Sequence, residues 1–281
     1  EVDLPFCISW ANETWTKAWV GDEKKVLILQ KYGEREEWKK HFDYLLKFFK
    51  DDRYIKVDGK PFFIIYRPEV VPCLNEMLDA WDKWAKENGF PGMCFAYQSN
   101  DFDLIKGRDN SRFDYDIEFQ PGFTTGQIKN QKFKTLRKMR RSVAHFVEKH
   151  FGLDLYRFGK DAINKVVDNR RFDYDTVWQS IIKTKPASNK NLPGAFVGWD
   201  NSPRHGERAT IYVGDTPEKF EKYMTKQIKN AKENYHSDML FMYAWNEWAE
   251  GGYLEPDTRN GYKNLEAIRN ALIKNNEFPK Y

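Results

Sequence analysis

The chain has 281 residues, of which 41% are hydrophobic, 16% aromatic and 31% charged, so it is neither a disordered nor a fibrous protein and can form one large α/β domain. Its net charge of +4 is far from the basic surplus of a nucleic-acid-binding protein. No apolar run approaches the roughly 20 residues of a membrane-spanning helix, and the N-terminal region has no signal-peptide pattern. We therefore expect a cytoplasmic protein without a membrane span and without a nucleic-acid partner.

Short apolar runs alternate with segments of helical periodicity along the chain. The runs have the length of buried strands and lie at residues 4–8, 61–66, 93–97, 115–119, 194–199 and 239–245. The helical spacing of apolar residues predicts helices at about 34–50, 74–88, 174–183, 216–235 and 262–272. A long polar and basic segment at about 123–190 follows the fourth run and is predicted to be an insertion that is helical in parts, including 132–150.

This alternation predicts parallel β-α units, and strands that are apolar throughout predict a sheet that is covered on both faces. A barrel and a doubly wound sheet both fit that pattern. The six strands are two fewer than a closed (β/α)8 barrel requires. Because the chain begins with Glu1 and not with Met, we also expect it to be a piece of a longer polypeptide, with residues 1–281 forming a single domain.

Aromatic, amide and charged side chains follow the carboxyl ends of the predicted strands. In a TIM barrel these ends converge on one face and form the active site. The expected substrate contacts are Trp10, Asn12, Glu13, Trp15, Tyr66, Arg67, Tyr97, Gln98, Trp199, Asp200, Asn201, Arg204, Trp245, Asn246, Trp248, Tyr253 and Glu255. Each type also has an ordinary structural use: tryptophans fill cores, Asn and Glu cap helices, and the group at 200–204 could brace a loop.

The segment after the last strand contains two carboxylates three residues apart, Glu247 and Glu250. If the segment forms a helical turn, their Cβ atoms lie roughly 5–6 Å apart on one face. Glycoside hydrolysis generally uses two carboxyl groups, and retaining enzymes hold them about 5–5.5 Å apart. The alternative is a solvated acidic loop, and spacing alone does not separate the two interpretations.

We find no pattern that requires a metal or a cofactor. The Asp-x-Asp spacings at 101/103, 114/116 and 173/175 are expected by chance in a chain with 42 acidic residues. Phosphate-binding glycine loops and the zinc-protease and serine-hydrolase motifs are absent from the sequence. The three cysteines are widely spaced, which argues against a disulfide framework and a cysteine-based zinc site.

Four motifs together resemble one known family. Residues 5–15 (PFCISWANETW), 54–61 (YIKVDGKP), 198–204 (GWDNSPR) and 246–251 (NEWAEG) are similar to the WbsX-like proteins, a bacterial group related to glycoside hydrolase family 99. The resemblance extends over essentially the whole chain. It implies a (β/α)8 barrel whose first two β-α units precede this chain, so that the six predicted strands are strands three to eight.

The same resemblance implies a chemistry. Family 99 enzymes are retaining endo-acting α-mannosidases, and their Asn-Glu-Trp-His-Glu motif matches Glu247 and Glu250 here. By resemblance, Glu247 is the base at the 2-hydroxyl of the sugar, which acts as the nucleophile. Glu250 protonates the departing oxygen and later activates water. Ala249 stands where family 99 has histidine.

Three functions remain open at this point. The first is a glycoside hydrolase-type enzyme that acts on α-linked glycans, either α-mannan-like or a bacterial surface polysaccharide. The second is a glycosyltransferase of lipopolysaccharide, O-antigen or capsule polysaccharide biosynthesis. The third is a glycan-binding barrel without catalysis, which the substitution at Ala249 favours. All three predict an oligosaccharide or polysaccharide ligand.

Overall fold

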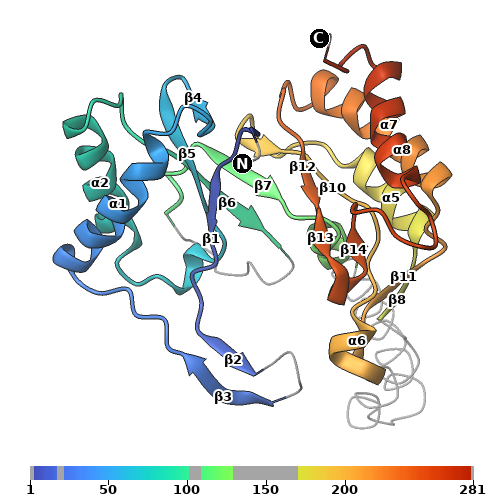
Figure 1. Ribbon diagram of the computed structural model, residues 1–281, viewed down its shortest axis with the longest axis horizontal. Coiled ribbons are helices and arrows are strands. Elements are labelled where there is room, and N and C mark those ends of the chain that lie inside the picture. The colour runs from blue at the N-terminus through green and yellow to red at the C-terminus, as the bar shows by residue number, and fades with distance from the viewer. Residues whose placement is uncertain (1–2, 18–21, 101–108, 129–169, 280–281) are drawn as a thin grey trace, which may run out of the picture. The chain divides into compact units, whose positions relative to one another are not determined.

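The structure is a computed structural model that describes residues 3–17, 22–100, 109–128 and 170–279 (Figure 1). The chain forms two compact units, each assembled from several segments. Unit 1 comprises Glu1–Phe119, Lys185–Gly194 and Ala231–Phe241, and unit 2 comprises Gln120–Thr184, Ala195–Asn230 and Met242–Tyr281.

Unit 1 is built on a parallel sheet in the order β1-β5-β6-β7-β9. Its strands are β1 (Ile8–Trp10), β5 (Lys60–Ile65), β6 (Cys94–Ser99), β7 (Tyr115–Glu118) and β9 (Asn191–Leu192). All four neighbouring pairs are parallel, and β4 (Lys56–Val57) adds an antiparallel hairpin to β5. The predicted strands at 61–66, 93–97 and 115–119 and their parallel arrangement are therefore confirmed, whereas the first strand lies at Ile8–Trp10 and shares only Ile8 with the predicted run at 4–8.

Both faces of this sheet are apolar, because the buried strands alternate their side chains between two hydrophobic clusters. Phe63 and Ile65 of β5 face helices α1 (Arg35–Phe49) and α2 (Leu74–Glu87), where Trp81 of α2 is fully buried. On the opposite face, Phe62 packs with a cluster whose other members include Ile64, Cys94, Ala96, Ile117 and Leu192. This two-sided burial explains why the strands read as unbroken apolar runs.

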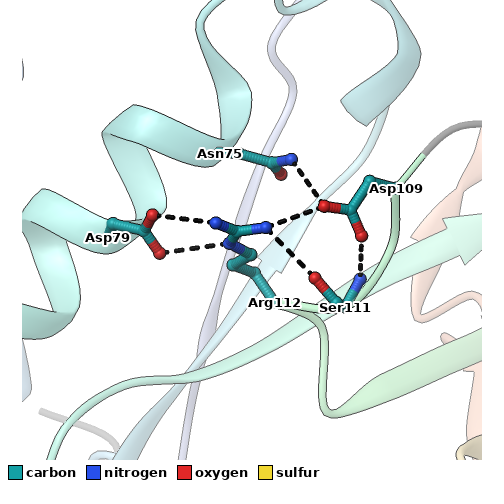
Figure 2. Close-up of polar contacts among 5 residues, drawn as sticks. All are labelled: Asn75, Asp79, Asp109, Ser111 and Arg112. Carbon is teal, nitrogen blue, oxygen red and sulfur yellow. Dashed lines mark hydrogen bonds and ion pairs between the residues drawn. The ribbon is translucent and has the colours of Figure 1, made fainter.

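An exposed polar network fastens the segment before β7 to helix α2 (Figure 2). The guanidinium of Arg112 donates to both carboxylate oxygens of Asp79 on α2, over 3.2 and 3.1 Å, and to Asp109 over 2.7 Å. Asn75 of α2 donates to the same oxygen of Asp109. Single exposed ion pairs contribute little to stability, so the value of this arrangement lies in several contacts that share one guanidinium. The network ties residues 109–112, just before β7, to α2.

Unit 1 also contains a hairpin that the sequence analysis did not predict. Strand β2 (Trp15–Lys17) pairs antiparallel with β3 (Asp22–Ile28), with two irregularities of register. The aliphatic side chains of residues 26–29 are largely exposed. A short 3-10 turn, η2 (Pro68–Val70), follows β5.

The last two predicted strands are present but short. Strand β10 (Gly194–Phe196) pairs with β12 (Phe241–Tyr243). Unit 2 adds the parallel pair of β8 (Arg171–Asp173) and β11 (Ile211–Val213) and the antiparallel pair of β13 (Asn246–Glu247) and β14 (Gly252–Tyr253). These additional strands have only two or three residues each.

The helices of unit 2 follow the sequence periodicity. They are α5 (Tyr174–Lys183), α6 (Ser202–His205), α7 (Pro217–Glu233) and α8 (Lys263–Lys274), with 3-10 turns η4 (Gly206–Arg208) and η5 (Trp248–Glu250) and a helical stretch at 122–128. In the core, the Trp178 ring of α5 stacks on Phe196 and on Tyr223 of α7, at centroid distances of 5.4 and 5.5 Å. The carboxylate of Asp173 caps α5 by accepting from the Thr176 amide.

The fold class is therefore mixed α/β with a parallel sheet, as predicted. The strands within the described residues do not close into a barrel. The predicted helix at 132–150 lies outside the described residues, as does most of the insertion at 123–190. No helix among the described residues is long and apolar enough to cross a membrane.

Candidate active site

The two carboxylates singled out by the sequence lie on one tight turn of unit 2. Glu247 ends β13 and is the N-cap of the 3-10 turn η5, and Glu250 is the last residue of that turn. In a 3-10 helix, side chains at positions i and i+3 lie almost directly above each other. Glu247 is the N-cap and has a non-helical backbone (φ -82°, ψ 64°), so the turn alone does not align the two side chains. What brings them together is a contact of each with Arg204.

Arg204 of α6 contacts both carboxylates. Its Nη1 donates to Oε1 of Glu250 over 2.5 Å, and its Nη2 lies 3.6 Å from Oε2 of Glu247. The Glu250 side chain is 19% exposed and the Glu247 side chain 43% exposed. One guanidinium thus holds two like charges close together, with Glu250 the more enclosed of the two.

Tyr243 of β12 supplies a second donor to Glu250. Its hydroxyl donates to Oε2, the carboxylate oxygen that Arg204 does not take. Burial raises the pKa of Tyr243 well above its usual value, and the hydrogen bond to Glu250 raises it further. The hydroxyl therefore stays protonated and acts as a fixed donor. The Tyr243 ring packs against Trp199 at a centroid distance of 4.9 Å.

Two glycines that follow Glu250 allow the chain to pass close to Tyr243 and Asp200. A Cβ on Gly252 would lie 2.4 Å from Cε1 of Tyr243, and one on Gly251 would lie 2.8 Å from the Asp200 amide nitrogen. Gly251 also has a φ of +62°, which side-chain-bearing residues rarely adopt. The Asp200 amide donates to the Glu250 carbonyl over 2.8 Å. This close packing fixes the backbone of the turn that carries the carboxylates.

Asp200 and Asn201 brace the neighbouring loop. The Asp200 carboxylate accepts from the Ser202 amide over 2.9 Å, and the Asn201 side-chain oxygen accepts from the Thr210 amide over 2.8 Å. Of the group at 200–204, these two residues have the bracing role that the sequence analysis left open. Arg204 is the member that reaches the carboxylates.

Large aromatic surfaces adjoin the turn. Trp248 is 47% exposed and stacks on Tyr253, with centroids 3.9 Å apart, and its indole nitrogen donates to Glu255 over 2.6 Å. Trp245 is 54% exposed, and Asn246 is also exposed. Exposed tryptophan faces of this kind suit sugar rings, which present flat apolar C–H surfaces.

The remaining predicted contacts lie in unit 1, where several have structural partners. Trp10 packs in the core against Trp81 of α2 and His41 of α1, at centroid distances of 6.4 and 4.9 Å. Tyr97 is buried, packs against Phe113 and donates to Asp116 over 3.0 Å. Tyr97 belongs to the core and the half-buried Trp10 packs against it, which is the structural use noted for aromatic residues at strand ends.

Asn12 and Arg67 hold the ends of β1 and β5 together. Asn12 is fully buried, and its amide both donates to the Arg67 carbonyl and accepts from the Arg67 amide, each over 2.7 Å. The guanidinium of Arg67 bonds Glu13 over 2.9 Å and Glu69 over 2.6 Å. Asn12 is therefore occupied by backbone groups, while the Glu13 side chain is partly exposed.

The last three residues of the set differ in their surroundings. Trp15 is exposed on β2, and Tyr66 is half-buried with its ring edge-on to Phe119. Among the described residues, the side-chain oxygen of Gln98 is buried without a hydrogen-bond partner. The predicted contacts thus divide between the two units, and the carboxylate pair with its aromatic neighbours belongs wholly to unit 2.

The sequence analysis did not single out the half-buried Tyr243 or the buried Glu118. Tyr243 lies within a predicted strand, immediately before the acidic motif, and that position was the available signal. Glu118 ends β7 and is only 1% exposed, and burial raises its pKa to about 7. The Tyr235 hydroxyl donates to it over 2.9 Å. Its place at a strand end was visible in the sequence, but its burial was not.

A metal role finds no support in the part of the chain that the structure describes. No group of three or more His, Cys, Asp or Glu side chains there is placed to hold a metal ion. Of the three Asp-x-Asp spacings, the one at 101/103 lies outside the described residues.

A family model described as "Glycosyltransferase WbsX" matches residues 1–268. The chain belongs to this family. The resemblance inferred from the four motifs is therefore confirmed. The description of the family names a glycosyltransferase, which is one class of carbohydrate-active enzyme.

Two similar proteins come from two strains of Xanthomonas campestris pv. campestris, and each is named "Uncharacterized protein WxcX". Each is 29% identical over 276 residues, which cover 97% of this chain and 35% of the relative. This WbsX family member thus spans about a third of the length of these relatives.

Similar solved structures include a "Glycoside hydrolase-like protein", with a TM-score of 0.48 and 11% identity over 87% of this chain and 61% of that one. The GH99 endo-alpha-mannosidase from Bacteroides thetaiotaomicron has a TM-score of 0.44 and 15% identity, over 88% of this chain and 63% of its own. A complex of a GH99 endo-alpha-mannosidase with Bis-Tris-propane has a TM-score of 0.44 and 14% identity, over 97% and 78%.

Proposed function

We propose that this WbsX family member acts on α-linked glycans, either α-mannan-like or a bacterial surface polysaccharide, with Glu247 and Glu250 as its catalytic pair. The observation that carries the proposal is that one guanidinium, that of Arg204, lies within 4 Å of an oxygen of each carboxylate. Close carboxyl pairs are the common requirement of glycosidic bond cleavage. The exposed indoles beside the pair supply surfaces on which sugar rings can stack.

The mechanism we propose uses the sugar's own 2-hydroxyl. Glu247 accepts the proton of that hydroxyl, and the 2-hydroxyl oxygen forms a bond to the anomeric carbon. The glycosidic bond breaks as Glu250 protonates the departing oxygen. Glu250 then takes a proton from water, which opens the 1,2-anhydro sugar, and Glu247 returns its proton to the 2-oxygen. The anomeric configuration is retained because the anomeric carbon is inverted twice, once in each step.

In this scheme Arg204 and Tyr243 have different duties. Glu250 must carry a proton when the glycosidic bond breaks. Its Oε2 accepts from Tyr243 and its Oε1 accepts from Arg204, so Oε1 can carry the proton only if the guanidinium leaves it. Substrate binding therefore has to move the guanidinium toward Glu247. There it stabilises the carboxylate that acts as base.

A glycosyltransferase is the second candidate, and the family's description favours it. The same pair can serve transfer if an acceptor hydroxyl replaces water and an activated donor supplies the sugar. This reaction would fit lipopolysaccharide, O-antigen or capsule polysaccharide biosynthesis. A transferase is distinguished from a hydrolase by turnover that depends on a nucleotide-linked or lipid-linked sugar.

We also propose a single (β/α)8-type domain as the setting of the site, with β1, β5, β6, β7, β10 and β12 as strands three to eight. Its support is that β1, β5, β6 and β7 lie side by side in chain order and are parallel, as consecutive barrel strands are.

The test compares wild-type protein with Glu250→Gln and Glu247→Gln. The substrates are α-mannooligosaccharides without any donor, the products are identified by mass spectrometry, and binding is measured by calorimetry. We expect turnover to fall at least about a thousandfold in both variants while binding persists, because each removes a proton-transfer group. Glu266→Gln on the exposed face of α8 makes the same chemical change away from the pair and serves as the control.

Each alternative has its own outcome. Full activity in Glu250→Gln would reject the catalytic assignment. Turnover only with an activated sugar donor would select the transferase. Glycan binding that is unchanged in a Glu247→Ala, Glu250→Ala double variant, together with no turnover by wild type, would select a non-catalytic binding protein.

A further inference from the structure

Unit 2 contains a pocket of about 690 Å³ beside the turn that carries Glu250. Its walls come from the segment after β10, from β11, from the start of α7, and from the chain between η5 and α8. Neither Glu247 nor Glu250 lines it. Its volume is within the range of pockets that bind small organic ligands, roughly 300–1,000 Å³.

A stacked aromatic pair separates this pocket from a second hollow of about 330 Å³. Trp248 and Tyr253 line both spaces, as do Asp257 and Arg259. The Tyr253 ring is held in place by its hydroxyl, which donates to Asp257 over 2.9 Å. The Asp257 carboxylate also accepts from the Asn260 amide over 2.5 Å, so the pair rests on a braced loop.

The polar lining offers both donors and acceptors. Arg171 and Arg259 are exposed at the pocket and supply guanidinium groups. Asp200, Asp215 and Asp257 supply carboxylates. Asn264, in the first turn of α8, adds an amide. The lining thus has two positive and three negative side chains, so carboxylates are in excess by one.

This excess of carboxylates distinguishes between ligand classes. A nucleoside diphosphate carries several negative charges and would be repelled by the three carboxylates. Sugar hydroxyls both donate and accept, and each sugar ring has an apolar face that can stack on an indole. Aromatic rings flanked by Arg, Asp and Asn side chains are therefore suited to a saccharide.

The pocket also adjoins the carboxylate pair through the chain. Trp248 and Gly251, which both line the pocket, are in the same turn as Glu250 or next to it. We propose that this pocket is a second saccharide subsite, which binds sugar units of the same glycan beyond the bond acted on. The inference rests on the proposed function. It makes the preferred substrate a chain of several sugars.

The test measures glycan affinity against chain length. Calorimetry on Glu250→Gln protein, which holds its ligand intact, compares α-mannobiose with α-mannotetraose and with UDP. We expect mannotetraose to bind more tightly than mannobiose. Arg259→Ala should raise the Kd for mannotetraose about tenfold, because it removes a charge-assisted hydrogen bond, and should leave the Kd for mannobiose unchanged. Arg269→Ala, an exposed arginine of α8, is the matched control.

The outcomes separate this subsite from the catalytic assignment. Equal affinity for the two glycans, or an Arg259→Ala variant that binds mannotetraose like the control, would overturn the subsite while a loss of turnover in Glu250→Gln still supports the catalytic pair. UDP binding that Arg259→Ala removes would assign the pocket to a nucleotide and also overturn it. Conversely, a length effect lost in Arg259→Ala supports the subsite even if Glu250→Gln remains active, and failure of both glycans to bind counts against it.

Discussion

Tyr243 shows how one hydroxyl can control a carboxylate. It donates to the Glu250 oxygen that Arg204 leaves open, and its raised pKa keeps the donor protonated throughout the neutral range. We predict that Tyr243→Phe lowers kcat/KM on the glycan substrate roughly tenfold to a hundredfold, since a hydrogen bond to a charged group is worth about 1.5–3 kcal/mol. Steady-state kinetics on the purified variant measure this loss.

The control for this prediction is Tyr262→Phe, which removes an equivalent hydroxyl from a ring that is largely exposed before α8. Circular dichroism and thermal melting of both variants separate a lost donor from a lost fold. Wild-type kcat/KM in Tyr243→Phe would show that the hydrogen bond has no part in the reaction.

Residue types at strand ends predicted where polar groups lie, but not whether those groups bind a ligand or hold the backbone. Asn12, Asp200 and Asn201 have the chemistry of ligand contacts, yet each bonds a backbone group. The partner of Asp200 lies only 2 positions away, whereas that of Asn12 lies 55 positions away. A single sequence gives no sign of a pairing as distant as that of Asn12. The Glu247–Glu250 spacing was informative because both members belong to one local turn.

At the scale of elements, long apolar patterns were reliable and very short elements were not. Helices α1, α2, α5, α7 and α8 each present an apolar face over ten or more residues, which made them visible as periodic segments. Strands β8, β9 and β11 have only two or three residues and show no period at all. Tertiary contacts rather than local preference therefore determine them.

The aromatic stack on α5 determines how the helices of unit 2 pack. Trp178 is fully buried between Phe196 and Tyr223, nearly parallel to both rings, with interplanar angles of 10° and 4°. We predict that Trp178→Ala lowers the free energy of unfolding by about 3–5 kcal/mol, through lost burial and the cavity left behind. Urea unfolding followed by circular dichroism provides the measurement.

Two further variants test the cause of that loss. Trp178→Phe keeps an aromatic ring in the stack and should be destabilised less than Trp178→Ala. Ile273→Ala, at an exposed position of α8, should change stability by less than about 0.5 kcal/mol. If Trp178→Ala unfolds at the same urea concentration as Ile273→Ala, the stack is not a core element of unit 2.

At the scale of the whole molecule, stability depends on pH through groups that act in opposite directions. Interactions with Arg53 hold the pKa of Asp51 down at about 2, so its contribution is present above the unfolded value and is lost as pH falls. Burial lowers the pKa of His41, which likewise favours folding at higher pH. Glu118 has the opposite effect, because burial raises its pKa from 4.5 to about 7.

The sign for Glu118 follows from proton binding. Between pH 4.5 and 7 the folded state holds a proton on Glu118 that the unfolded state has released, so stability falls as pH rises through this window. We predict that Glu118→Gln, which remains neutral, gains up to about 3 kcal/mol relative to wild type between pH 4.5 and pH 8. Because Asp51 and His41 titrate alike in both proteins, the difference isolates Glu118. Urea unfolding at pH 4.5, 6 and 8 measures this difference in the free energy of unfolding, with Glu266→Gln as the control. If the difference between Glu118→Gln and wild type does not change with pH, Glu118 is charged in the folded protein.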